Sequence, residues 1–274
     1  MDRPRQTSSK NKLVIDNFNL AVSLLDENPR DRKAISRLRR NVFFEDTDSM
    51  VLLGTIYADG DPDERDESIA LFRRAADRGN SSAMRNIGYC YAIGLNVPKD
   101  KEAAVLCYKQ AMDAGNAGAA CNLGVMYDYG SGTDQDYAKA FECYKFAAEH
   151  GSTRGMTNLG EYYAAGKGTE RNYDLAEKWF TESGSPRAKH RLALLYMDVP
   201  AKKDWRKGLA ILKESADEGY GKAMIRYADE VGGDEAIDYY TKAAAKGNPE
   251  AAEKLRSLGL PVPTVVRRRK KSSD

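Results

Sequence analysis

The sequence predicts an all-α protein built from stacked pairs of antiparallel helices. Glycines recur along the 274 residues at intervals of 34, 36 and 36, at Gly54, Gly88, Gly124 and Gly160. Small, aliphatic and tyrosine residues surround each glycine at helical spacing. The composition agrees, because 35 alanines and 16 tyrosines suit helices packed closely: alanine is the strongest helix former and adds little bulk between backbones.

The first helix of each unit is marked by a small residue, an aliphatic residue and a tyrosine at spacings of four. In one copy these are Ala119, Leu123 and Tyr127, which share one helical face. Gly124 lies inside this helix at a cost of about 1 kcal/mol relative to alanine, so its recurrence indicates close approach of a neighbouring helix. Gly130 fits a C-cap. The equivalent residues of the flanking copies are Ala83, Ile87, Gly88, Tyr91 and Gly94, and Gly155, Leu159, Gly160, Tyr163 and Gly166.

A second helix follows a polar loop. Asp100, Asp136 and Asn172 each precede an alanine by four residues, a position that suits an N-cap. The unit is therefore helix A, loop and helix B, close to 36 residues. A single pair cannot bury its apolar faces, so the pairs are expected to stack into a solenoid.

Weaker copies extend the array at both ends. The first unit begins near Leu53, with its second helix near residues 68–76. In the repeat that contains Gly160, helix B ends at Gly184 and is expected to be about one turn shorter than helix B of the other repeats. Another unit spans residues 188–212, and in the next one the loop shrinks to Gly232 and Gly233. A final capping helix is expected around residues 251–258.

The repeated pattern resembles Sel1-like repeats, which are relatives of tetratricopeptide repeats. The resemblance covers residues 47–258, as about six repeats plus a C-terminal capping helix, of which three repeats match closely and three are degenerate. It implies a right-handed α-solenoid. It also implies a non-enzymatic scaffold or adaptor that holds other proteins, often in regulatory or quality-control assemblies.

Residues 1–46 and 259–274 flank the repeats and do not follow their pattern. Residues 13–46 show two amphipathic patterns separated by Asn28 and Pro29, and we expect a capping helix pair because the end of a solenoid needs covering. Residues 1–12 are predicted to be disordered. Residues 259–274 are predicted to be a flexible basic tail.

In repeats of this family, helix A lines the concave surface. In each repeat, the residues two and six positions before the glycine inside helix A share one face of that helix, next to the face that packs in the core. Asparagine offers donor and acceptor groups to a peptide backbone, and arginine binds carboxylates bidentately. We therefore predict a groove for another protein or an acidic or C-terminal peptide, with its contacts drawn from Asn86, Asn122, Arg154, Asn158, Arg187, Arg191, Lys222 and Arg226.

Two simpler interpretations remain open. The asparagines also fit a structural role between helix ends and loops, and the cations also fit a solvated stripe. The tail carries Arg267, Arg268, Arg269, Lys270 and Lys271. This run suits a nuclear localisation signal or a binding patch for nucleic acid or anionic lipid. It equally suits a charged terminus that only increases solubility.

Motifs of catalysis and metal binding are missing from the sequence. There is no phosphate-binding loop, nucleophile elbow or metalloprotease motif, and the two histidines, His150 and His190, have no zinc-ligand spacing. We predict no metal and no cofactor. A hydrolase with an unrecognised groove site is the alternative, with His190 as a candidate base that lacks an evident partner.

Charge and cysteine content bear on compartment. The 43 Lys and Arg nearly balance the 41 Asp and Glu, so we expect no nucleic-acid binding except through the tail. No apolar run reaches the ~20 residues of a transmembrane helix, and the polar start is a poor signal peptide. We expect a cytoplasmic protein, or a nuclear one in a eukaryote. Cys107 and Cys143 should be free thiols, whereas pairing of Cys90 with Cys121 stays open.

Overall fold

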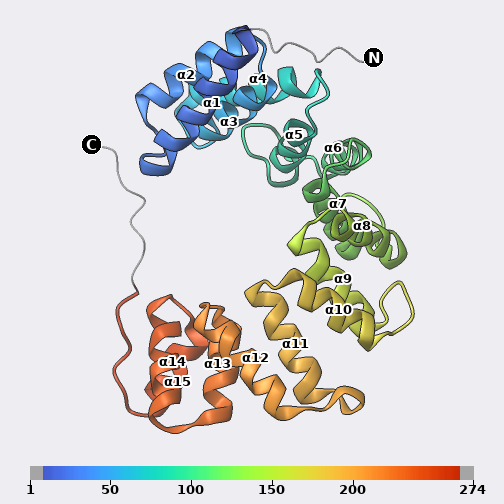
Figure 1. The fold of residues 1–274 in the computed structure, drawn as a ribbon, viewed down its shortest axis with the longest axis vertical. Helices are drawn as coiled ribbons and strands as arrows, with labels where there is room; N and C mark the ends of the chain where they lie inside the picture. The colour runs from blue at the N-terminus through green and yellow to red at the C-terminus, as the bar shows by residue number, and fades with distance from the viewer. Residues whose placement is uncertain (1–8, 266–274) are drawn as a thin grey trace. The chain divides into compact units, whose positions relative to one another are not determined.

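The computed structural model describes residues 9–265, which are helical throughout apart from their loops and contain no strand (Figure 1). The chain divides into two compact units, residues 1–150 and 151–274. The helices of unit 1 are α1 (Ser9–Glu27), α2 (Arg32–Phe43), α3 (Thr47–Tyr57), α4 (Pro62–Ala76), α5 (Ser81–Ile93), α6 (Lys101–Asp113), α7 (Ala117–Tyr129) and α8 (Tyr137–Glu149). Those of unit 2 are α9 (Thr153–Ala165), α10 (Tyr173–Ser183), α11 (Pro186–Asp198), the 3₁₀-helix η1 (Pro200–Lys202), α12 (Trp205–Asp217), α13 (Gly221–Val231), α14 (Gly233–Ala245) and α15 (Pro249–Ser257).

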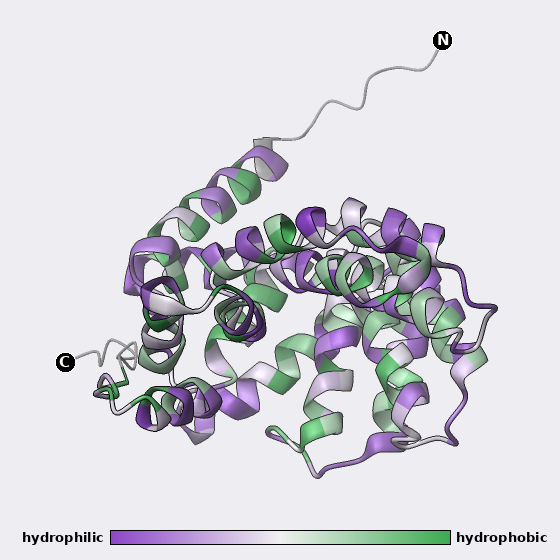
Figure 2. Cartoon of the chain, turned by 90° about the horizontal axis from the view of Figure 1, so that it is seen from below, coloured by the Kyte–Doolittle hydropathy of each residue, from purple (hydrophilic) through white to green (hydrophobic). Residues whose placement is uncertain are grey.

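Within each unit, consecutive helices pack as pairs, and each pair contacts the next pair of the same unit. In the repeats, the odd-numbered helix is helix A and the even-numbered one that follows is helix B. This arrangement is the α-solenoid of stacked pairs that the sequence predicts. Figure 2 shows hydrophilic and hydrophobic residues interspersed along the helices, as expected for helices that bury one face only.

The helix ends form where the sequence places them. Gly94, Gly130 and Gly166 end α5, α7 and α9 in the left-handed conformation, which glycine adopts without a steric penalty. Asp100, Asp136 and Asn172 cap α6, α8 and α10, each accepting a hydrogen bond from a backbone N–H three residues on. Helix α10 is short as predicted, because Gly184 ends it after 11 residues.

The glycine inside helix A is required by the packing of helix B. A Cβ atom on Gly124 would lie 2.7 Å from the Tyr144 ring, and one on Gly160 would lie 2.6 Å from the Phe180 ring. Gly54 and Gly88 face Phe72 and Tyr108 in the same way. The predicted close approach is therefore confirmed, and its partner is the bulky residue of the same repeat's helix B.

Each unit has its own core of alanines, leucines and tyrosines. In unit 1, the first four helices bury a cluster that includes Leu38, Leu53 and Tyr57. In unit 2, a cluster around Leu212 and Tyr240 extends to the last helix. Cys90, Cys107, Cys121 and Cys143 form no disulfide bond, so Cys90 and Cys121 are not bridged. Within residues 9–265, no helix is both long and apolar enough to cross a membrane.

The ends of the array differ in detail from the expectations. Helix α1 begins at Ser9 rather than at residue 13, because residues 9–12 contain no helix-breaking residue. Helix α4 begins at Pro62 rather than near Ser68, because Asp61 caps it and proline suits the first helical position. After α15, Leu260 and Val262 pack against the unit 2 core, so the chain is held in place beyond residue 259.

Candidate binding surface on the first helices of the repeats

We call the exposed side of α5, α7, α9, α11 and α13 the helix-A face, and we describe it separately in each unit. In α5 this side carries Ser82, Asn86, Tyr89 and Ile93, at spacings of four, three and four. Helix α7 is its neighbour: the Nδ2 atom of Asn116, at the N-cap of α7, donates to the hydroxyls of Ser81 and Ser82 at 3.4 and 3.5 Å. The repeats thus bring equivalent positions of consecutive helices side by side.

In unit 1, exposed apolar side chains extend the predicted asparagine positions. Asn86 and Asn122 are both half-buried. One turn further along each helix are Tyr89 and Val125, and then Ile93 and Tyr129. All four are exposed, and the Tyr129 residue retains 75% of its accessible surface. Sequence reasoning missed these residues, although large apolar residues at two equivalent positions outside the core pattern were a signal.

In unit 2, Asn158 occupies the same position on α9 in a different environment. The residue is only 8% exposed, so its side chain offers a ligand much less surface than the half-buried Asn86 and Asn122. A structural role for Asn158 therefore stays a prediction beside the binding role.

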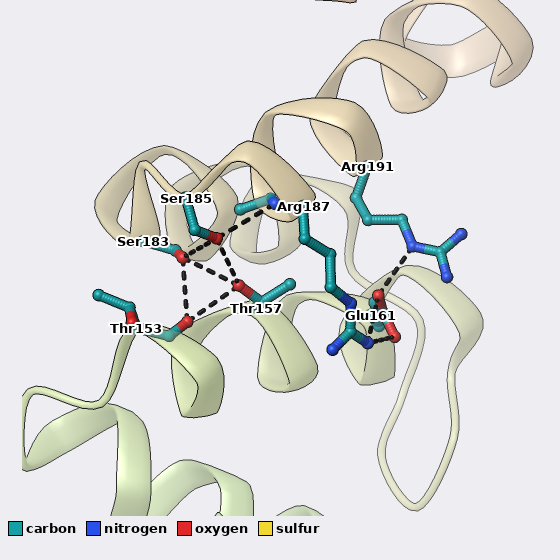
Figure 3. Close-up of polar contacts among 8 residues, drawn as sticks. Thr153, Thr157, Glu161, Ser183, Ser185, Arg187 and Arg191 are labelled. Carbon is teal, nitrogen blue, oxygen red and sulfur yellow. Dashed lines mark hydrogen bonds and ion pairs between the residues drawn. The ribbon is translucent and has the colours of Figure 1, made fainter. Parts of the chain in front are cut away.

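Two of the predicted cations hold a carboxylate of the chain itself. Nη2 of Arg187 lies 2.9 Å from both carboxylate oxygens of Glu161, and Nε of Arg191 donates to Oε1 at 2.7 Å (Figure 3). Glu161 is at the α9 position equivalent to Tyr89 and Val125. Both arginine side chains remain 40% exposed, so solvent screening keeps these pairs weak. The pairing shows that the two guanidinium groups converge on one carboxylate.

The remaining cations lie further along unit 2 or at its start. Arg226 on α13 pairs with Asp198 at 3.2 Å and with Glu230 at 2.9 Å. Lys222, one turn earlier, is exposed and forms no ion pair within residues 9–265. Arg154 is exposed on the first turn of α9. The five predicted cations of unit 2 thus outnumber the three carboxylates, Glu161, Asp198 and Glu230, with which some of them pair.

A hydroxyl cluster beside these arginines fixes α9 against the start of α11. The Thr157 and Ser183 hydroxyls lie 2.9 Å apart, and the Ser183 hydroxyl donates to the Thr153 carbonyl at 3.0 Å (Figure 3). The Ser185 hydroxyl contacts both and caps α11 by accepting from the Ala188 N–H. The cluster is satisfied internally and positions the backbone from which Arg187 extends.

His190 is held as a neutral core residue. It is buried against the edge of the Tyr220 ring, with centroids 5.3 Å apart. Burial first, and then the charges of Arg191, Lys222 and Arg226, lower its pKa to about 4. Its Nδ1 atom has no partner in the described part of the chain, so no carboxylate orients the ring as a general base would require. Burial also raises the pKa of Cys90 to about 11 and that of Cys143 to about 12, so these thiols stay protonated at neutral pH.

Arg267, Arg268, Arg269, Lys270 and Lys271 lie outside the described residues. For metals, residues 9–265 contain no group of three or more His, Cys, Asp and Glu side chains arranged to hold an ion.

The repeat pattern decides the family. A sequence model of the Sel1 repeat matches residues 47–80, 81–116, 117–152, 153–185 and 222–248. The chain belongs to the Sel1 repeat family. The α11–α12 pair between the last two matched segments is packed like the others, so a degenerate repeat keeps the fold there. Sel1 repeat proteins are typically scaffolds for protein interactions and are generally non-catalytic.

Solved Sel1-type structures resemble this chain in fold. A Sel1 repeat protein from Oxalobacter formigenes is 23% identical with a TM-score of 0.70, and the match covers 83% of this chain and 96% of that one. A protective antigen of uropathogenic Escherichia coli with an SLR fold is 25% identical with a TM-score of 0.68. That match covers 91% of this chain but only 57% of the antigen. Comparison with curated proteins gave no match.

Proposed function

We propose that this Sel1 repeat chain is an adaptor whose helix-A face binds a segment of a partner protein, in a regulatory or quality-control assembly. The observation that carries the proposal is the recurrence of exposed side chains at equivalent positions of successive A helices. Tyr89, Ile93, Val125 and Tyr129 are not needed to bury the core, and exposed apolar clusters of this kind mark interaction sites. Tyrosine in particular is enriched among residues that dominate binding energy.

Each unit favours its own chemistry in a segment that binds to it. On α5 and α7, apolar side chains beside Asn86 and Asn122 suit a segment that offers apolar groups and backbone hydrogen bonds. On α9, α11 and α13, the positive excess suits an acidic segment or a C-terminal carboxylate. Glu161 supports this assignment, since it already occupies the place between Arg187 and Arg191 that a ligand carboxylate would take. An acidic ligand there competes with Glu161 or binds beside it, next to Lys222.

An affinity capture from the native lysate, read by mass spectrometry, tests the apolar part. We expect Tyr129→Ser to weaken capture of the partner at least fivefold, which is the loss of about 1 kcal/mol that defines a significant contact. The control is Leu106→Ser, because Leu106 is 62% exposed on the B helix α6. Equal capture by wild type and both variants, with equal helicity by circular dichroism, would contradict this assignment.

For the basic helix-A face of unit 2, two substitutions at the Glu161 ion pairs should change partner capture in opposite directions. Glu161→Gln frees both arginines and should strengthen capture of an acidic partner, whereas Arg191→Glu should weaken it. Arg206→Glu on the B helix α12 makes the same charge change as Arg191→Glu at another exposed position. The proposal fails for this unit if Glu161→Gln weakens capture or if Arg206→Glu acts as strongly as Arg191→Glu.

A further inference from the structure

A basic hollow lies between the two N-terminal helices, on elements that the helix-A face does not use. It has a volume of about 430 Å³ and belongs to unit 1. No carboxylate lines it. Its six lining residues are the cations Arg32, Lys33, Arg37 and Arg40 and the neutral Asn17 and Ser36. Four like charges around one hollow attract a compact anion or an anionic surface.

These cations contribute little to holding the fold together. Arg32, Lys33 and Arg40 form no ion pair with any residue from 9 to 265. The Arg37 Nη1 atom donates to the Asn17 Oδ1 atom at 2.9 Å, which positions the side chain and leaves its charge unneutralised. Arg39 of the same helix is different, since its Nε donates to the Tyr57 hydroxyl at 2.9 Å and its Nη2 lies 3.4 Å from Glu67.

The placement of the cations also opposes the electrostatics of helix α2. Arg32 and Lys33 occupy its first turn, which contains no acidic residue. Positive charge there is unfavourable, because the N-terminal end of a helix dipole is itself positive. Asp31 at the N-cap offsets part of this cost by accepting from two backbone N–H groups. Basic residues at a helix N-terminus go against the local electrostatic preference, and here they form no ion pair among the described residues that would offset the cost. Such an exception indicates a functional role for Arg32 and Lys33.

Exposed apolar side chains border the cations. On α1, Leu13 and Leu20 lie four residues before and three residues after Asn17, on the same flank, and both are exposed. On α2, Phe43 continues the line of Ser36 and Arg40 and is 79% exposed. Figure 2 shows hydrophobic and hydrophilic residues alternating along the helix that follows the N mark. We call this combination of cations and apolar residues the α1–α2 face.

We infer that the α1–α2 face binds the phosphate headgroups of an anionic lipid surface. Arginine guanidinium groups match phosphate oxygens bidentately, and each cation near such a surface adds to binding. Leu13, Leu20 and Phe43 then enter the boundary between headgroups and acyl chains, as the apolar side of an interfacial helix does. A nucleic-acid backbone would satisfy the cations but would leave these three side chains in water.

Co-sedimentation of the full-length chain with lipid vesicles tests the inference. The probes are vesicles of phosphatidylcholine alone and vesicles in which about a third of the lipid is phosphatidylglycerol. We expect wild type to sediment with the anionic vesicles only. Lys33→Gln/Arg40→Gln should lower the partition coefficient about 25-fold, since each cation near such a surface contributes about fivefold. Leu13→Ser/Leu20→Ser should lower it as well, whereas Leu106→Ser should not.

Two matched variants separate this face from charge in general and from the basic tail. Lys109→Gln/Lys145→Gln removes two charges from the B helices α6 and α8, and Arg268→Gln/Lys270→Gln removes two from the tail. Circular dichroism confirms that each variant folds. The inference is overturned if all three charge variants lose binding equally, if only the tail variant loses it, or if the leucine variant binds like wild type. It is also overturned if wild type ignores anionic vesicles but binds a polyglutamate peptide through Lys33 and Arg40, which would make the face a protein-docking site.

Discussion

At the scale of single residues, the structure separates side chains that stabilise the fold from those left for a ligand. Glu161 neutralises part of the charge of Arg187 and Arg191, so neither arginine is simply solvated. Asn158 is buried, unlike the half-buried Asn86 and Asn122 at the equivalent positions of unit 1. His190 belongs to the first group, because its ring fills space beside Tyr220 and stays neutral near three cations.

The lowered pKa of His190 makes the stability of unit 2 depend on pH. Its pKa of about 4 in the folded chain lies below the ordinary value of 6.5. Between these values the unfolded chain binds a proton that the folded chain does not, so the free energy of unfolding falls as pH drops from about 6.5 towards 4. We expect His190→Gln to reduce this fall by about 1–3 kcal/mol. Urea unfolding followed by fluorescence reports on unit 2, since both tryptophans, Trp179 and Trp205, lie there. Parallel stability curves for the two proteins would contradict the assignment.

At the scale of helices, local signals allowed most of the fold to be predicted. The N-caps, the C-cap glycines and the inner glycines lie within one repeat and depend on contacts close in sequence, as with Asp136, Gly130 and Gly124. The contact of Arg187 and Arg191 with Glu161 was not predicted, because it depends on how one repeat packs on the next. The start of α4 was also missed, since its first turns are polar and show no apolar periodicity.

Replacing the glycine inside helix A by alanine should lower the free energy of unfolding, whereas the same change at another helical glycine should not. Gly124→Ala gains about 1 kcal/mol of helix propensity, but the new Cβ would lie 2.7 Å from the buried Tyr144 ring. Overpacking of this kind costs about 1–3 kcal/mol, so we expect net destabilisation. Gly118→Ala in the same helix is the control, because its nearest neighbour is the flexible end of Arg85. Urea unfolding should rank Gly124→Ala below wild type and Gly118→Ala at or above it, and the reverse order would contradict the packing argument.

At the scale of the whole molecule, each helix pair contacts mainly the neighbouring pairs of its own unit. Stability in such arrays is approximately a sum of repeat and nearest-neighbour contributions. Both units also keep their own core, around Leu53 in one and Leu212 in the other. A solenoid of this kind adds binding positions by adding repeats, which is how residues 36 apart in sequence provide similar surfaces on α5 and α7.

Local stability predicts that core damage stays within one unit. Leu53 and Leu212 are both fully buried, and truncating a buried leucine to alanine costs about 2–5 kcal/mol. In hydrogen exchange read by mass spectrometry, Leu53→Ala should speed exchange in α2–α4 and leave α12–α14 protected as in wild type. Leu212→Ala should do the opposite, which makes each variant the control for the other. If either substitution speeds exchange equally in both units, the chain unfolds as one cooperative body. A core substitution in one unit would then also impair the helix-A face of the other unit. Only surface substitutions such as Tyr129→Ser and Arg191→Glu could assign a partner contact to one unit.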